Sequence, residues 1–304
     1  MKIAIVGAGA MGSLFGGLLA EAGQDVWLLD VWPEHVETIN RQGLSIERQG
    51  QVRTIKAQAT TDPGRIGPAD LVIVFVKSTQ TAAAAVTARD LIGEAGVVLT
   101  LQNGLGNADV IAEVVDPRNV LAGTTSHGAT LLGPGVIRHA GIGATVIGAW
   151  SSRDQSSARR AAEVMTRAGI STQVAEDVKV LIWEKFLINV GINAITALCG
   201  VKNGQLLDLE VTRDLMRLAV EEAVAVAKAQ GIPIKDGAVE RVYQVAAATG
   251  ANRSSMGQDV DKRRQTEIAV INGAVVREAG RVGIPVPVNR TLTALIETLQ
   301  AHYQ

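Results

Sequence analysis

A polar stripe interrupts an otherwise apolar stretch in the second half of the chain. Residues 183–193 read WEKFLINVGIN, in which Lys185, Asn189 and Asn193 follow one another at intervals of four. On a helix this spacing places all three side chains on one face. Because an ammonium group and two amides are costly to bury without partners, the stripe is predicted to belong to a reactive or binding site rather than to a packing interface.

Two further groups of residues have types suited to chemistry. Asn103-Gly104 directly follows a β-like apolar run, so it is expected at the carboxyl edge of a parallel sheet, where ligands bind. The cluster Ser254 to Asp259 lies shortly before Glu267, and Glu267 is expected at the start of an apolar-periodic helix. Spacing alone assigns no role to this cluster or to Glu267.

A glycine-rich turn near the N-terminus indicates a dinucleotide cofactor. The turn consists of Gly7, Ala8, Gly9, Ala10, Met11 and Gly12, placed between a β-like run and an apolar helical segment. In this pattern the first glycine allows the tight turn, the second lets the backbone approach the pyrophosphate, and the third lets helix pack on strand. The helix N-terminus then faces the phosphates.

The residues expected to select the cofactor lie at the ends of two later strands. Asp30 ends the second predicted strand, where a carboxylate accepts hydrogen bonds from the adenosine ribose and repels a 2′-phosphate, so NADH is favoured over NADPH. Lys77 ends the next strand and is also predicted to bind the cofactor. Arg41, Arg48 and Arg53 leave contact with a phosphate open.

The first half of the chain alternates between strand and helix patterns. Strands are expected at residues 2–6, 25–30, 71–76 and 97–101, with a helix at 81–91 before the last of them. Such alternation predicts a parallel sheet with right-handed crossovers. Short β-like pieces between Val120 and Gly148 suggest antiparallel additions at one edge of that sheet.

From about residue 176 onward the pattern is helical. Helices are expected at residues 177–198, 211–230, 237–248, 266–282 and 289–300. The fold is therefore predicted to be α/β, with an N-terminal Rossmann-type doubly wound domain (1–174) and a C-terminal all-helical substrate and catalytic domain (175–304). Apolar faces on these helices are compatible with a homodimer through the helical domain.

The composition excludes several classes of function. The 304 residues include 29 basic and 30 acidic side chains, so no net field attracts nucleic acid or a membrane surface. The single Cys199 and the four histidines show no metal-ligand spacing, so no metal is expected. Residues 3–20 are uncharged and could imitate a secretory signal, but their five glycines argue against it, and a soluble cytoplasmic protein is predicted.

In combination, these motifs resemble the ketopantoate reductase (2-dehydropantoate 2-reductase) family over essentially the whole chain. The resemblance is carried by the glycine turn, Lys77, Asn103-Gly104, Lys185 with Asn189 and Asn193, Asn203-Gly204, Ser255-Met256 with Gln258-Asp259, Thr266-Glu267-Ile268, and Ile271-Asn272-Gly273. It implies an oxidoreductase that uses NAD(P)H to reduce a 2-keto acid, 2-dehydropantoate to (R)-pantoate, within pantothenate and coenzyme A biosynthesis.

The resemblance also implies roles for individual residues. Lys185 matches the catalytic acid of the family, and Glu267 matches the glutamate that assists it. Asn189, Asn193, Asn203 and Ser255 are expected to hold the 2-keto acid, and Asn103, Ala129 and Glu267 to contact the nicotinamide half of the cofactor. The lysine suits the chemistry, because hydride transfer to a ketone leaves negative charge on an oxygen that an ammonium can stabilise and protonate.

Other functions stay open at this point. Family members that use NADPH commonly carry a basic residue where this chain has Asp30-Val31-Trp32, and NADH-linked D-2-hydroxyacid dehydrogenases, which act on other branched or aromatic 2-keto acids, share the lysine and the glutamate. Dehydrogenases of 3-hydroxyacids and sugar phosphates have a similar helix, but phosphorylated substrates call for more basic residues. A non-catalytic dinucleotide sensor would need neither Lys185 nor Glu267.

Overall fold

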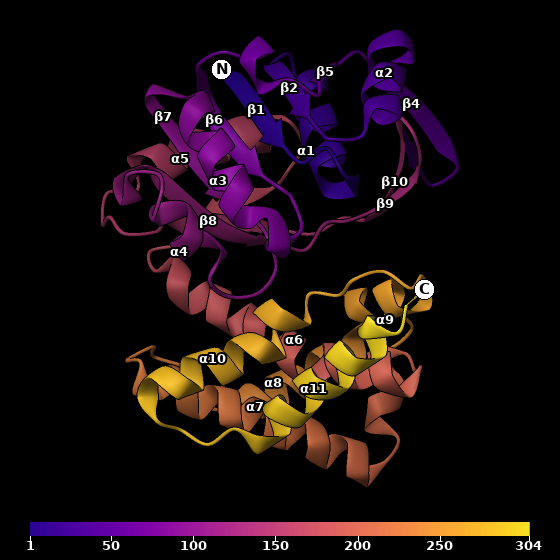
Figure 1. Ribbon diagram of the computed structural model, residues 1–304, viewed down its shortest axis with the longest axis vertical. Helices are drawn as coiled ribbons and strands as arrows, with labels where there is room; N and C mark the ends of the chain where they lie inside the picture. The colour runs from indigo at the N-terminus through magenta and orange to yellow at the C-terminus, as the bar shows by residue number, and fades with distance from the viewer. Residues whose placement is uncertain (304) are drawn as a thin grey trace. The chain divides into compact units, whose positions relative to one another are not determined.

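The computed structural model describes residues 1–303 and divides the chain into two compact units, drawn in Figure 1. The first unit comprises residues 1–102 and 107–178, and the second comprises residues 103–106 together with the chain from Lys179 onward. The sequence predicts a boundary after residue 174, whereas the first unit continues to Val178. Four residues from the middle of the first half thus pack with the helices of the second.

A twisted sheet forms the centre of the first unit, and it confirms the predicted Rossmann-type fold. Across the described residues its strand order is β12-β11-β8-β7-β6-β1-β2-β5. Pairing is parallel from β8 through to β5, and β11 adds an antiparallel strand next to β8. The strands are β1 (Lys2–Val6), β2 (Asp25–Leu29), β5 (Gln58–Thr60), β6 (Ala69–Val74), β7 (Ile92–Thr100), β8 (Val120–Thr125), β11 (Thr145–Ala149) and β12 (Thr172–Val174).

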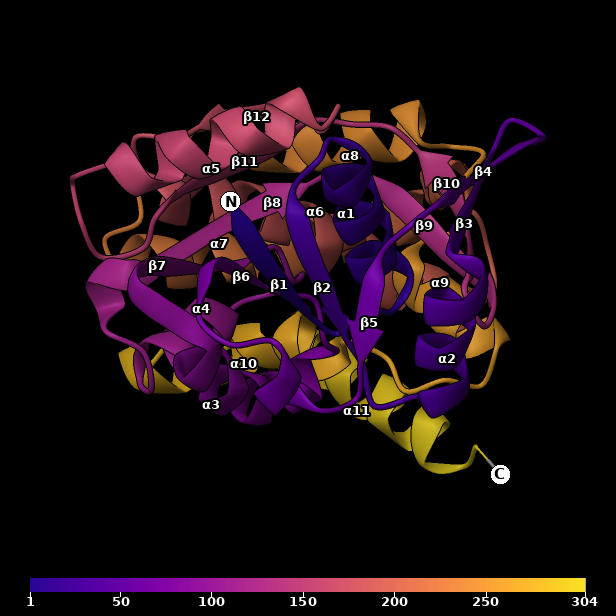
Figure 2. The ribbon, with the colours of Figure 1, turned by 90° about the horizontal axis from the view of Figure 1, so that it is seen from above.

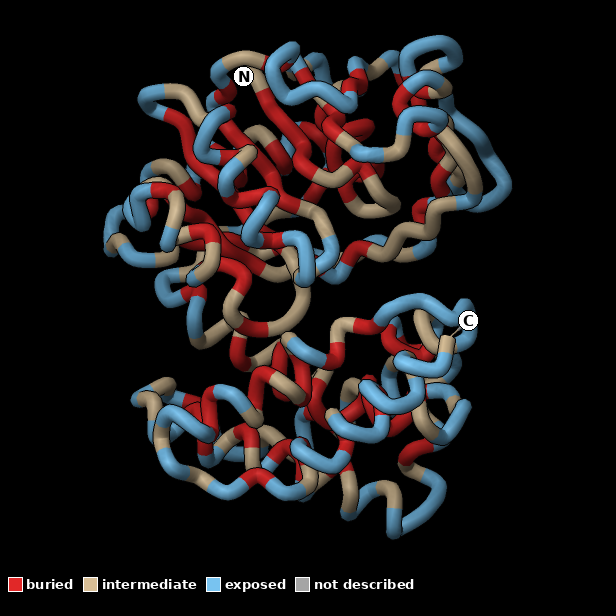
Figure 3. The backbone as a smooth tube through the Cα atoms, in the orientation of Figure 1, coloured by how far each residue is buried: buried red, intermediate tan, exposed pale blue. Residues whose placement is uncertain are grey.

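Helices cover both faces of this sheet, as a doubly wound fold requires. Figure 2 shows α3 and α4 on one face, and α1 and α5 on the other. The strands between them are almost wholly buried, as the red trace in Figure 3 shows, because both sheet faces lie against apolar helix sides. The helical segments are α1 (Ala10–Glu21), α2 (Pro33–Gln42), η1 (Pro63–Arg65), η2 (Ser78–Gln80), α3 (Thr81–Leu91), α4 (Asn107–Ala112), η3 (Pro117–Asn119) and α5 (Ser156–Arg167).

A second, smaller sheet corrects the expectation for residues 120–148. Only β8 and β11 extend the main sheet, whereas the two strands between them join two strands from earlier in the chain. The smaller sheet has the order β4-β3-β10-β9, with β3 (Leu44–Arg48), β4 (Gln51–Ile55), β9 (Gly128–Gly133) and β10 (Val136–Gly141). A parallel pairing of β10 with β3 holds the two hairpins together.

The second unit is all-helical, as predicted. Its helices are α6 (Val178–Cys199), η4 (Asn203–Leu207), α7 (Glu210–Ala229), α8 (Ala238–Ala248), α9 (Ser255–Asp261), η5 (Ile268–Val270), α10 (Asn272–Val282) and α11 (Pro287–Ala301). The expected continuous helix at 266–282 is wrong, because the backbone leaves the helical region at Ile271 (φ −108°, ψ −102°) and α10 begins at Asn272. Glu267 therefore lies in the turn before α10 rather than on a helix.

Helix α6 is long and apolar enough to cross a membrane by length and composition alone. However, 61% of its most apolar 18-residue window is buried inside the protein. Phe186, Val190 and Ile195 belong to the core of the helical unit. This burial is what a central helix of a water-soluble domain shows.

Burial disfavours the charged form of three histidines in the first unit. The Nδ1 atom of His35 accepts the Gly135 N–H at 3.0 Å, so that nitrogen carries no proton. His127 Nδ1 and His139 Nε2 lie 3.1 Å apart, and one of these two atoms must accept. Burial is the main cause that lowers the pKa of each of the three imidazoles below its ordinary value of 6.5.

These histidines predict a loss of stability in mild acid. Below about pH 6.5 the unfolded chain binds more protons than the folded chain does, so the free energy of unfolding falls as the pH drops. Urea unfolding at about pH 7.5 and about pH 5.5 should give a lower midpoint in acid, and a His35→Gln, His127→Gln double variant should show less of this dependence. His302→Gln, at an exposed position, is the control. An unchanged wild-type midpoint would contradict the prediction.

Candidate active site

The glycine turn joins β1 to α1 at the carboxyl edge of the main sheet. Gly7 has φ +96°, a conformation that favours glycine, and its N–H donates to the Leu29 carbonyl at 2.9 Å. A Cβ atom on Gly12 would collide with the Gly7 carbonyl oxygen, whereas one on Gly9 would meet no atom within 4 Å. Within residues 1–303, no side chain caps the N-terminus of α1. The turn thus offers open backbone and an uncapped helix end, which fit a pyrophosphate group.

Three of the other residues predicted to bind the cofactor lie in the first unit, whereas Asn103 and Glu267 belong to the second. Asp30 follows β2, next to the glycine turn, and its Oδ1 atom accepts the Trp32 N–H at 3.0 Å. Lys77 is exposed and follows β6, the strand on the other side of β1. Ala129 belongs to β9, where it pairs with His139 in the smaller sheet. Asp30, the turn and Lys77 therefore share one edge of three adjacent strands.

Helix α6 carries the polar stripe of the second unit. Lys185, Asn189 and Asn193 occupy successive turns, and Asn193 is buried while the other two are partly buried. Burial of apolar side chains, rather than local propensity, stabilises this helix, and Trp183, Phe186 and Leu187 fix it in the core. The predicted arrangement on one helix is thus present in the fold.

The segment Asn103 to Gly106 is bound against the turn before α10. Gly104 has φ +85°, and a Cβ atom there would collide with the Val270 carbonyl oxygen. The same oxygen accepts the Leu105 N–H at 2.9 Å. Glycine at this position is what allows the loop to approach so closely. As a result, Asn103 lies beside Glu267 and Lys185 although it is remote from both in sequence.

Asn103 joins the lysine to the glutamate through its amide. The Lys185 Nζ atom donates to Asn103 Oδ1 at 3.1 Å, and Asn103 Nδ2 donates to Glu267 Oε2 at 3.2 Å. The amide thus uses its acceptor on the ammonium and its donor on the carboxylate. The chain of contacts orients the ammonium group and places a negative charge two hydrogen bonds away from it.

The environment of Lys185 lowers the affinity of its amine for a proton. Burial lowers the pKa of Lys185 from its ordinary value of 10.5 to about 8, and the negative charge of Glu267 offsets part of that effect. An ammonium with a pKa near 8 is still protonated at neutral pH but gives up its proton far more readily than a surface lysine. Such a group suits general acid catalysis.

The remaining predicted substrate residues occupy the far end of α6 and its surroundings. Asn203 begins η4 and is buried, and its Nδ2 atom donates to Thr249 Oγ1 at 3.0 Å. Among the described residues, its Oδ1 atom is buried without a hydrogen-bond partner. Ser255 is exposed on the first turn of α9. Asn203 thus bonds to the loop after α8 in this structure, rather than to the polar face of α6.

Two residues that the sequence analysis did not single out hold this loop to α6. The Thr196 hydroxyl donates to Ser254 Oγ at 2.7 Å, and Ser254 in turn accepts the Gly257 N–H at 3.0 Å to cap α9. Arg253 Nη1 donates to the carbonyls of Thr196 and Val201 at 2.6 and 2.7 Å, which satisfies the end of α6. A serine directly before a helix is a recognisable N-cap, so the sequence contains a signal for the role of Ser254 in capping α9. The sequence contains no signal for its hydrogen bond with Thr196.

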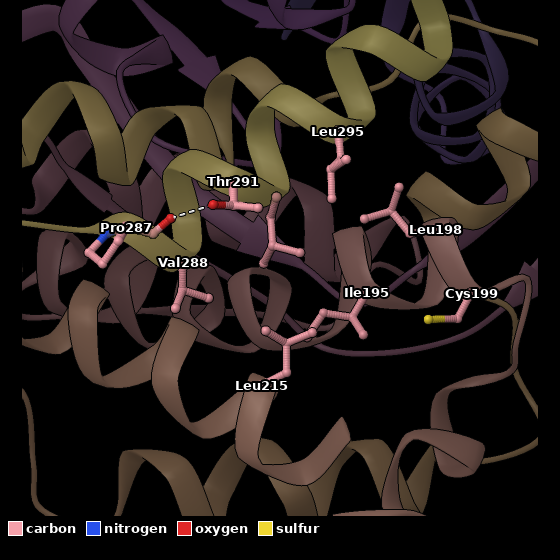
Figure 4. A pocket seen from close by; sticks show the side chains of 9 residues that line it. Ile195, Leu198, Cys199, Leu215, Pro287, Val288, Thr291 and Leu295 are labelled. Atoms are coloured by element: carbon pink, nitrogen blue, oxygen red, sulfur yellow. Dashed lines mark hydrogen bonds between the residues drawn. The ribbon is translucent and has the colours of Figure 1, made fainter. Parts of the chain in front are cut away.

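An apolar cavity of about 310 Å³ lies elsewhere in the helical unit, between α6, α7 and α11 (Figure 4). Its lining comprises Ile195, Leu198, Cys199, Leu215, Pro287, Val288, Thr291, Leu292 and Leu295. Thr291 turns its hydroxyl back to the Pro287 carbonyl at 2.9 Å and so offers it to no ligand. The described lining is apolar apart from Thr291 and Cys199, and none of the residues predicted to bind the substrate belongs to it.

The first unit has a glycine turn of the dinucleotide-binding type on a doubly wound sheet. The second unit has a lysine, an amide and a carboxylate in hydrogen-bond contact. Together these features define a nicotinamide-dependent oxidoreductase. The family model described as "Ketopantoate reductase PanE/ApbA" matches residues 3–152, and the model of its C-terminal part matches residues 177–300. The chain belongs to the ketopantoate reductase family.

Individual relatives cover the whole chain. The 2-dehydropantoate 2-reductase of Halobacterium salinarum is 42% identical over 99% of this chain and 99% of its own. Among solved structures, the PanE/ApbA family ketopantoate reductase from Ralstonia eutropha superposes with a TM-score of 0.91 at 35% identity and covers 100% of both chains. A D-mandelate dehydrogenase with NADH and anilino(oxo)acetate has a TM-score of 0.91 at 29% identity, covering 99% of this chain and 98% of its own.

Proposed function

We propose that the protein reduces 2-dehydropantoate to (R)-pantoate, a step of pantothenate biosynthesis, with NADH as the preferred cofactor. The observation that carries the proposal is the contact chain from Lys185 through Asn103 to Glu267, in a protein whose relatives are named 2-dehydropantoate 2-reductases. The bound dihydronicotinamide supplies the hydride. Lys185 supplies the proton, so that the ketone gains the two hydrogens of an alcohol.

Each proposed residue has a defined task in this reaction. The Lys185 ammonium donates a hydrogen bond to the keto oxygen, stabilises the charge that forms there and transfers its proton to that oxygen. Asn103 and Glu267 orient the ammonium. Asn189, Asn193, Asn203 and Ser255 hold the substrate carboxylate and hydroxyl with amide and hydroxyl donors. Ala129, Lys77, Asp30 and the residues of the glycine turn bind the cofactor.

Initial rates with a panel of substrates test the proposal. 2-Dehydropantoate is assayed with NADH and with NADPH, followed by branched and aromatic 2-keto acids under the same conditions. The highest kcat/KM for 2-dehydropantoate with NADH supports the proposal in full. An inert 2-dehydropantoate with rapid turnover of another 2-keto acid overturns it in favour of a D-2-hydroxyacid dehydrogenase, the second candidate, which the similarity to D-mandelate dehydrogenase supports.

The pH dependence of the rate gives a separate prediction for Lys185. Because the acid must be protonated, kcat/KM for reduction should be level below about pH 8 and fall about tenfold per unit above it. Glu267→Gln removes the charge that raises the pKa, so the break should move to lower pH. Glu184→Gln, on the preceding residue of α6, should leave the break in place. A break that Glu267→Gln does not move would contradict the assignment.

We further propose a cytoplasmic enzyme that forms a homodimer through the helical unit. The support is that the exposed large apolar side chains described in that unit lie on α7, just before it, or on α11: Leu209, Val211, Leu218, Leu295 and Leu299. Light scattering after size-exclusion chromatography should give twice the mass of one chain. Leu295→Glu should reduce it to the mass of one chain.

A further inference from the structure

Two fully buried asparagines connect the helices of the second unit. Asn272 is the first residue of α10 and Asn289 lies in the first turn of α11, and both have 0% of their surface exposed. The motif Ile271-Asn272-Gly273 has no task in the reaction proposed above. A buried amide without a task in binding or catalysis requires an explanation.

The contacts of Asn272 lead from one helix to the next. Its Nδ2 atom donates to the Val190 carbonyl of α6 at 3.2 Å and to Asn289 Oδ1 at 2.9 Å. Asn289 Nδ2 in turn donates to the Ala219 carbonyl at 2.9 Å and to Glu222 Oε2 at 2.7 Å, both on α7. The Glu222 carboxylate also accepts the N–H groups of Val288 and Asn289 at 2.8 and 2.9 Å, which caps α11. One polar network therefore joins α6, α7, α10 and α11.

This polar network stabilises the helical unit less than apolar packing would. Among the described residues, Asn272 Oδ1 is buried without a hydrogen-bond partner. An unsatisfied buried acceptor destabilises the folded state, whereas an apolar side chain of similar size carries no such cost. Unlike an apolar side chain, the amide makes a directional contact. Its hydrogen bond to the Val190 carbonyl fixes the position of α10 along the axis of α6.

The position of α10 along α6 affects the candidate site, because Lys185 lies near one end of this contact and Glu267 near the other. Val190 directly follows Asn189 on α6, one turn beyond Lys185. On the other side, Glu267 is joined to Asn272 only by the short η5 turn, and that turn includes Val270, whose carbonyl binds the loop of Asn103. The contact from Asn272 to Val190 therefore sets Glu267 and Asn103 against Lys185.

We propose that Asn272 is a positioning residue, which keeps the Asn103 amide at bonding distance from the Lys185 ammonium and the Glu267 carboxylate at bonding distance from Asn103. The inference rests on the proposed role of Lys185 only where it concerns turnover. Losing the contact lets the η5 turn and the loop of Asn103 draw back, while the apolar packing of α6 keeps Lys185 buried. The Lys185 ammonium then loses the nearby negative charge of Glu267 but stays shielded from water.

The test replaces Asn272 by Leu, which fills the space without hydrogen bonds. Asn272→Leu should lower kcat about 10- to 100-fold with KM within about twofold, as expected for a misplaced catalytic group. The control is Val275→Ala, a fully buried position one turn further along α10, which disturbs the same helix without touching the network. It should lower the unfolding midpoint and leave kcat near that of the wild type.

A second readout needs neither cofactor nor substrate. The reactivity of Lys185 toward acetic anhydride, followed against pH by peptide mass spectrometry, reports the proton affinity of its amine. The half-maximal pH should fall in Asn272→Leu and stay at the wild-type value in Val275→Ala. An unchanged or raised half-maximal pH in Asn272→Leu overturns the proposal, even if kcat falls.

The two proposals fail separately. If no 2-keto acid is turned over, the proposed function is lost, yet the acetylation profile still decides the role of Asn272. Should Asn272→Leu not fold, Asn272→Ser is measured instead, since serine is too short to reach the Val190 carbonyl and adds no apolar bulk. The same fall in half-maximal pH is expected for it.

Discussion

Replacing Lys185 by Ala should lower kcat for keto acid reduction by about 10²- to 10⁴-fold, the usual contribution of a positioned general acid. The ammonium is the group that the Asn103 and Glu267 contacts hold in place, and its pKa of about 8 keeps it protonated at neutral pH. Alanine leaves the keto oxygen to be protonated by water. Steady-state rates with saturating cofactor measure the loss.

The matched control is Lys179→Ala, which removes an exposed lysine from the first turn of the same helix. Its kcat should stay within about twofold of the wild type, because exposed charges far from a reacting atom contribute little. Cofactor binding, followed by the fluorescence of the reduced nicotinamide, should be retained in both variants. Full turnover by Lys185→Ala would revive the interpretation of the chain as a dinucleotide sensor.

Replacing Asp30 by Ser should reverse the proposed preference for NADH. The carboxylate follows β2 beside the glycine turn, and the Trp32 N–H holds one of its oxygens at 3.0 Å. Hydrogen bonds to a charged group contribute about 1.5–3 kcal/mol, so kcat/KM with NADH should fall about 10- to 100-fold. With NADPH it should rise, because a 2′-phosphate no longer meets a negative charge.

Asp25→Ser provides the comparison for this prediction. Asp25 begins the same strand and is exposed at the opposite end from the glycine turn. It should leave the ratio of kcat/KM values for the two cofactors unchanged. A wild-type enzyme that already prefers NADPH would show that Asp30 does not select the cofactor.

Periodicity was a sufficient guide to most elements of the fold. Helix α3 spans the predicted residues, and α6, α7, α8 and α11 begin and end within two residues of the expected positions. These segments have strong 3.6-residue or continuous apolar patterns, so the local signal and the tertiary burial agree. The parallel order of the central strands followed from their alternation with helices.

The smaller sheet could not be predicted in this way. Its central pairing joins Ser45 of β3 to Val136 of β10, and no local pattern encodes which remote strand a strand pairs with. The break at Ile271 was hidden for a related reason. The apolar periodicity continues through it, and only the buried contacts of Asn272 show why α10 begins there.

The candidate site likewise has a part that local sequence patterns predict and a part that only tertiary structure shows. The spacing of Lys185, Asn189 and Asn193 was visible because one helix carries all three. The contacts of Asn103 with Lys185 and Glu267 span 82 and 164 residues, so the bridging role of this amide depends on tertiary structure alone. The sequence could therefore identify the candidate residues, but the distances between them are set by the tertiary structure.

The placement of residues 103–106 has a consequence for how the protein is made. This short segment is translated early, in the middle of the sheet unit, yet it packs with residues translated much later. Until the ribosome has passed Val270, the backbone oxygen that receives Leu105 does not exist. The contact between this loop and the turn before α10 can therefore form only after nearly nine-tenths of the chain has been synthesised.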